Sequence, residues 1–82
     1  MDEIPVDPAS WLAGVMLKDS GIRQQYNLII IAIKKPNGTM LFNPSYETVI
    51  HGGDTVIAMG KSENLKELEA VLRPREISNE MD

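Results

Sequence analysis

The chain has 82 residues, of which 43% are hydrophobic and 24% charged, a composition typical of one small globular domain. Its net charge of −4 opposes docking on a phosphate backbone and argues against a nucleic-acid partner. It contains no cysteine, which excludes a disulfide framework and a thiol nucleophile, and a domain of this size buries so little surface that we expect an oligomeric contact.

Four segments have the pattern of β-strands. Residues 4–7 alternate apolar and polar side chains, and Pro5 restricts such a strand to an edge or an end. Residues 28–33 are a continuous β-branched run, which predicts a central strand covered on both faces. This run has six residues against the roughly 20 of a membrane-spanning helix, so we expect no membrane insertion. Pro36-Asn37-Gly38 predicts a tight hairpin turn, followed by strands at 39–42 and 55–59.

Two segments have helical spacing. The first helix is expected to start near Leu12 or Gly14, to break at Asp19-Ser20-Gly21 and to end near Tyr26. The second follows Gly60 and carries one apolar stripe, formed by Leu65, Leu68, Val71 and Leu72. We therefore predict an α/β (α+β) fold with a small mixed, mostly antiparallel sheet of about four strands and two helices, and a polar tail over residues 73–82.

The residues that catalysis or metal binding would need are missing or isolated. Gly60-Lys61-Ser62 stands where a phosphate-binding loop would stand, but the glycine required five positions earlier is replaced by Thr55. His51 is the only histidine, and its glycine-rich surroundings indicate a turn in which Asp54 bonds its own turn amides. We therefore predict no enzyme activity, no catalytic residue, no metal site and no resident cofactor.

A structural role alone does not account for the residues from Ser20 to Asn27. It places a basic side chain and an amide beside apolar residues just before the predicted central strand. Helix ends beside strands are common positions for ligand contacts, so this segment is the candidate binding site.

The order of several short motifs resembles the TrkA C-terminal domain family, also called the RCK C-terminal family of regulators of potassium conductance. The resemblance covers residues 4–72, which we predict to be the regulatory domain. Its motifs, in chain order, are Leu12-Ala13-Gly14, Ser20 to Tyr26, Leu28 to Lys35, Asn37-Gly38, Asn43-Pro44, Gly53-Asp54 and Ala58-Met59-Gly60.

The resemblance implies a cytoplasmic regulatory module that follows a Rossmann-type domain in potassium channels and uptake systems. The chain has no Gly-x-Gly-x-x-Gly motif, so NAD or ATP binding is not carried over to it. Modules of this family pair as homodimers, and some bind a small effector such as cyclic di-AMP between the two copies. The matching residues are Ile22, suited to a base face, Arg23, suited to a phosphate, and Asn27. The alternative is a dimerisation or accessory domain of another ion permease that binds no ligand.

Overall fold

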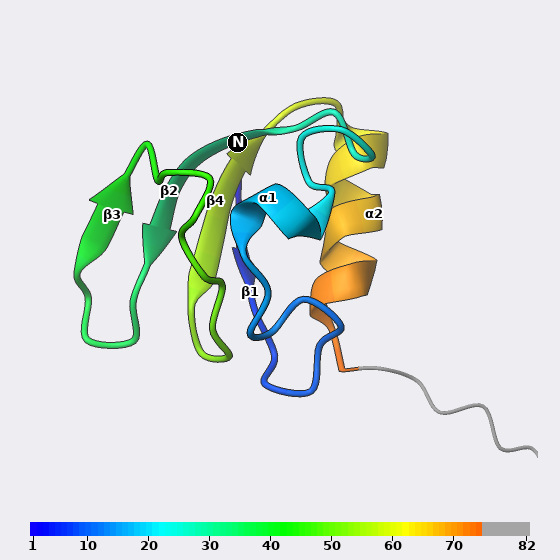
Figure 1. Ribbon diagram of the computed structural model, residues 1–82. Helices are drawn as coiled ribbons and strands as arrows, with labels where there is room; N and C mark the ends of the chain where they lie inside the picture. Colours follow the sequence, from blue (N-terminus) through cyan, green and yellow to red (C-terminus); the bar gives the residue numbers. More distant parts are fainter. Residues whose placement is uncertain (75–82) are drawn as a thin grey trace, which may run out of the picture.

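The computed structural model describes residues 1–74, which form a four-stranded sheet with two helices on one of its faces (Figure 1). The strands are β1 (Asp2–Pro5), β2 (Ile29–Lys34), β3 (Met40–Phe42) and β4 (Thr55–Met59), in the spatial order β1-β4-β2-β3. The helices are α1 (Leu17–Ser20) and α2 (Ser62–Leu72). The predicted architecture is confirmed, and all three strand pairs are antiparallel, so the sheet is not mixed. The predicted tail lies, from residue 75 onward, outside the described residues.

The β2–β3 hairpin forms where the sequence predicts it. The Lys35 N–H donates to the Thr39 carbonyl at 2.7 Å, and the Gly38 N–H donates to the Lys35 carbonyl at 2.9 Å. Gly38 has φ +92°, which makes this a three-residue loop that ends in a left-handed residue. The Asn37 carboxamide accepts the Thr39 N–H at 3.0 Å and rigidifies the loop.

The first strand is shifted relative to its prediction. β1 covers Asp2–Pro5 instead of residues 4–7, and Ile4 lies opposite Val56 on β4. Pro5 is the last residue of this edge strand, as the sequence indicates. Asp7 leaves the strand because its carboxylate accepts the Ala9 N–H at 2.8 Å and begins a turn.

The predicted long, two-part helix is wrong. Only one turn, α1, is helical, because Gly14 and Gly21 take left-handed φ values of +87° and +77° on either side of it. Met16, just before α1, is in extended conformation and forms a bridge with Val49. The segment from Gly21 to Tyr26 continues as turns, so the second part of the predicted helix is absent. Glycines interrupt this segment, and its apolar residues pack from turns although they have helical spacing.

The core lies between one face of the sheet and the helices (Figure 1). β4 pairs with both β1 and β2, and α2 directs its apolar stripe onto the same face. The opposite face is partly open, since Ile29 is 61% exposed, so the prediction that β2 is covered on both sides is wrong. The cluster comprises Ile4, Val6, Leu12, Leu17, Ile22, Leu28, Ile30, Ile33, Ile50, Val56, Ala58, Leu65, Leu68 and Leu72.

Neither helix within residues 1–74 has the length and apolar character needed to cross a membrane.

We expect Leu68→Ala to lower the free energy of unfolding by about 2–5 kcal/mol, because Leu68 is fully buried where α2 packs on the sheet and truncation leaves a cavity. Urea denaturation of the purified chain measures the change. Glu67→Ala, one position earlier on the exposed face of α2, is the control and should change the value by less than about 0.5 kcal/mol. Equal effects of the two substitutions would contradict this account of the core.

Candidate functional site

A hollow of about 260 Å³ lies between α1, the turn that follows it and the start of β2. Three apolar side chains, Leu17, Ile22 and Ile30, belong to the buried core and form its floor. The more exposed lining side chains are Lys18, Arg23, Gln24 and Tyr46. Among residues 1–74, no carboxylate lines the hollow, so it is locally cationic in a chain whose net charge is −4. An apolar floor with two cationic groups is suited to an anionic ligand that also carries an apolar or aromatic part.

Arg23 and Tyr46 meet across this hollow although they are far apart in the sequence. The guanidinium carbon of Arg23 lies 4.7 Å from the centre of the Tyr46 ring, a cation–π contact. Neither of the two ion pairs found within residues 1–74 involves Arg23. No carboxylate within the described residues therefore neutralises the charge of Arg23, which suits it to bind an anion.

The loop that carries Tyr46 is attached to the start of α1 by backbone hydrogen bonds. The Lys18 N–H donates to the Tyr46 carbonyl at 2.9 Å, and the Leu17 N–H donates to the Thr48 carbonyl at 2.8 Å. Ser20 secures the other end of α1, where its hydroxyl donates to the Leu17 carbonyl at 2.7 Å and accepts the Ile22 N–H at 3.2 Å. One side of the hollow is thus held by backbone bonds between distant segments, and the other by local bonds of Ser20.

The structure brings together two of the three predicted site residues. Ile22 is 1% exposed at the floor of the hollow, and Arg23 lies among its exposed lining residues. Asn27 is exposed but is not among the residues that line the hollow, and it has φ +53°, a conformation that asparagine tolerates better than most residues. Asn27 therefore lies at the turn that leads into β2. A role in ligand binding stays a prediction for Ile22, Arg23 and Asn27.

Sequence reasoning missed Lys18 and Tyr46. Both are exposed polar or amphipathic residues in segments without a motif of their own, and only the packing of the loop after β3 against α1 places them beside Arg23. The weak signal was an aromatic residue two positions after Asn43-Pro44, where the strand pattern stops.

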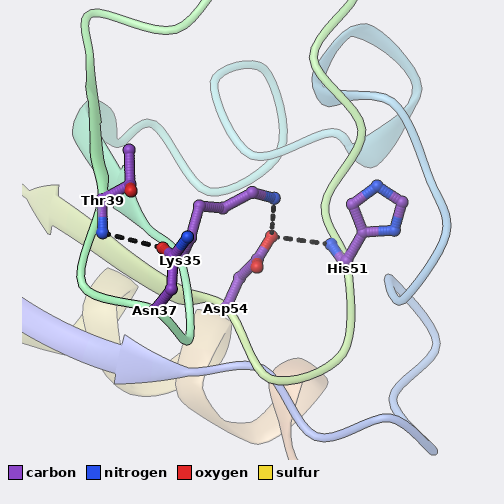
Figure 2. Close-up of polar contacts among 5 residues, drawn as sticks. All are labelled: Lys35, Asn37, Thr39, His51 and Asp54. Carbon is purple, nitrogen blue, oxygen red and sulfur yellow. Dashed lines mark hydrogen bonds and ion pairs between the residues drawn. The ribbon is translucent and has the colours of Figure 1, made fainter.

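A second polar cluster connects the hairpin to the turn before β4 (Figure 2). Asp54 is 1% exposed, and its Oδ2 accepts hydrogen bonds from the Lys35 ammonium at 2.9 Å and the His51 backbone N–H at 3.0 Å. The bond to its own turn was predicted, whereas the ion pair with Lys35 was not. In Figure 2 the His51 ring points away from the carboxylate, so only its backbone takes part. This arrangement is structural, since the carboxylate is buried and both bonds to Oδ2 come from protein groups.

Within residues 1–74, no group of three histidine or acidic side chains is placed to hold a metal ion. Lys61 and Ser62 form the corner between β4 and α2, with Lys61 as the residue before the helix and no side-chain cap at that end.

The model of the TrkA-C domain matches residues 1–73. The chain belongs to the TrkA-C domain family. The resemblance seen in the sequence motifs is confirmed, and this family is one of regulatory, non-catalytic domains.

Two curated relatives are potassium transport proteins. Potassium channel protein 1 of Methanocaldococcus jannaschii is 43% identical over 54 residues, which are 66% of this chain and 16% of that protein. The K(+)/H(+) antiporter subunit KhtT of Bacillus subtilis is 36% identical over 55 residues, which are 67% of this chain and 33% of that protein. The chain thus spans about a third or less of the length of these relatives.

Two similar solved structures contain c-di-AMP. The RCK C domain of the potassium transport protein KtrA, in complex with cyclic diadenosine monophosphate, has a TM-score of 0.71 and 28% identity, covering 84% of this chain and 80% of that one. The RCK_C domain dimer of Streptococcus agalactiae BusR, in complex with c-di-AMP, has a TM-score of 0.79 over 87% of this chain and 92% of that one. At 22% identity, the BusR likeness supports the fold alone.

We expect Lys35→Ala to lower the free energy of unfolding by about 1–3 kcal/mol, because it leaves the buried Asp54 carboxylate without its charged donor. Lys34→Ala is the matched control. Lys34 is the exposed neighbour on β2, and its removal should change stability by less than about 0.5 kcal/mol. Urea denaturation of both variants measures the change. A free energy of unfolding that Lys35→Ala leaves unchanged would show that the ion pair with Asp54 does not stabilise the domain.

Proposed function

We propose that this TrkA-C domain is the effector-sensing module of a cytoplasmic potassium transport regulator, and that residues 4–72 are the sensing unit. Its effector is a cyclic dinucleotide, bound by Ile22 and Arg23 in the hollow beside α1. The observation that carries this proposal is the combination of an apolar floor, two cationic side chains and no carboxylate in one hollow of an acidic chain. The complex of KtrA, 28% identical to this chain, with c-di-AMP supports the choice of ligand.

The size of the hollow favours a ligand shared between two chains. About 260 Å³ is slightly below the roughly 300–1,000 Å³ of sites that enclose a whole drug-sized ligand. Two hollows facing each other across a two-fold axis would present two copies of Arg23 to the two phosphates of a cyclic dinucleotide. Asn27 lies close in sequence to the hollow and would contribute, in this proposal, from the rim of the paired site.

A domain of this kind does no chemistry on its ligand. An effector that binds one arrangement of the paired subunits more tightly than another shifts the equilibrium between them by the difference in binding free energy. In the parent protein, that shift would act through a Rossmann-type domain on a membrane potassium pore or antiporter. The two potassium transport relatives, in which the matched region is only a part, support this context.

A second function is favoured by the open face of the sheet. Ile29 and Met59 lie opposite each other on β2 and β4, and both are exposed large apolar side chains. A domain that only dimerises, as an accessory part of another ion permease, would bury such a pair and need no effector. Both functions need a dimer, which the mass in solution tests. The response of the dimer to nucleotides separates the two functions.

We expect c-di-AMP to stabilise the purified chain, by about 2.7 kcal/mol at a free concentration one hundred times the Kd. Thermal unfolding with c-di-AMP, ADP or NAD measures this, and analytical ultracentrifugation gives the mass with and without ligand. A dimer stabilised by c-di-AMP alone is the expected result. A dimer that responds to none of these nucleotides would contradict sensing and favour the accessory function.

Arg23→Ala should weaken c-di-AMP binding roughly 10- to 150-fold, which corresponds to the loss of a charge-assisted hydrogen bond of about 1.5–3 kcal/mol. Arg73→Ala is the matched control, because Arg73 is an exposed arginine at the end of α2 and does not line the hollow. Titration calorimetry gives both dissociation constants. Wild-type affinity in the Arg23 variant would exclude this residue as the phosphate ligand.

A further inference from the structure

The position of Tyr46 is set by backbone contacts and not by its own ring. Its carbonyl accepts the Lys18 N–H, and the turn that contains it is closed by the Thr48 N–H, which donates to the Ser45 carbonyl at 3.1 Å. The hydroxyls of Ser45 and Thr48 lie 3.2 Å apart and add a side-chain contact across the same turn. Tyr46 is 61% exposed and lines the hollow, so these backbone contacts hold an accessible aromatic residue there.

One region of that surface is covered by Arg23. Arg23 precedes the β2–β3 hairpin in the sequence and Tyr46 follows it, and their side chains meet at the hollow. A cation–π contact between exposed groups is weak, whereas a guanidinium binds a phosphate through short, charge-assisted and often bidentate hydrogen bonds. An incoming phosphate would therefore take Arg23 away from the ring.

We propose that Tyr46 is the nucleobase platform of this site. When the phosphate engages Arg23, a base stacks on the Tyr46 ring in place of the guanidinium, while Leu17, Ile22 and Ile30 line the floor beneath. This inference rests on the proposed function and names the feature that the site selects, a planar aromatic base joined to a phosphate. A phosphorylated ligand without a base would engage Arg23 and leave the ring without a stacking partner.

The alternative role for Tyr46 is to position Arg23 through the cation–π contact and nothing more. Two substitutions test whether binding needs the aromatic face at all, and the NMR titration described below separates stacking on a base from positioning of Arg23. Tyr46→Phe retains the aromatic face and loses only the hydroxyl, so its affinity for c-di-AMP should stay within twofold of wild type. Tyr46→Leu retains an apolar side chain but has no π-face. Its affinity should fall roughly 5- to 150-fold, the range for loss of one base–aromatic stack.

The direct test is NMR of the full chain with labelled tyrosine, titrated with c-di-AMP. The chain has two tyrosines, and Tyr26, which packs against the core and does not line the hollow, is the internal control. Stacking predicts that the ring signals of Tyr46 shift upfield in step with binding while those of Tyr26 do not.

If calorimetry detects binding but the Tyr46 ring does not shift, or if Tyr46→Leu binds like wild type, the platform is excluded and the sensing function stands. Absence of any c-di-AMP binding to wild type would instead overturn the sensing function, and the platform with it.

Discussion

The buried carboxylate of Asp54 is the contact on which the arrangement of this domain depends. It precedes β4, the strand that pairs with both β1 and β2, and it binds the end of the β2–β3 hairpin through Lys35 and the preceding turn through the His51 N–H. A charge at this depth is tolerated only because donors surround it. By joining the hairpin to the start of β4, the pair helps to set how β2 lies beside β4, and β2 in turn supplies Ile30 to the floor of the hollow.

The hollow follows from how the chain leaves and re-enters the sheet. Helix α1 is a single turn that begins after extended Met16 and ends at left-handed Gly21, and the loop after β3 bonds to its start. The result places two cations and an aromatic ring above core side chains without any motif that links them in the sequence. A longer helix, continued to Tyr26, would have occupied the position of these turns.

The charged side chains that line the hollow favour an anionic ligand. The chain as a whole is acidic, yet the charged side chains that line the hollow within the described part of the chain are the cations Lys18 and Arg23. The contact between Arg23 and Tyr46 is a cation–π contact between exposed groups, a weak interaction that the proposed site exchanges for a phosphate. The proposed sensing then needs no chemistry, only a difference in affinity between two arrangements of paired subunits.

From the sequence alone, the hairpin, the last strand and helix α2 could be placed, because an Asn-Gly turn, a β-branched run and an apolar stripe without internal glycine are local signals. The family was also recognisable from the order of its short motifs, whereas ligand binding by Ile22, Arg23 and Asn27 stays a prediction. The sequence could not show that the first helix is one turn, that Lys35 reaches Asp54, or that Tyr46 meets Arg23. Each of these depends on contacts between segments distant along the chain, and only the folded structure decides which of them form.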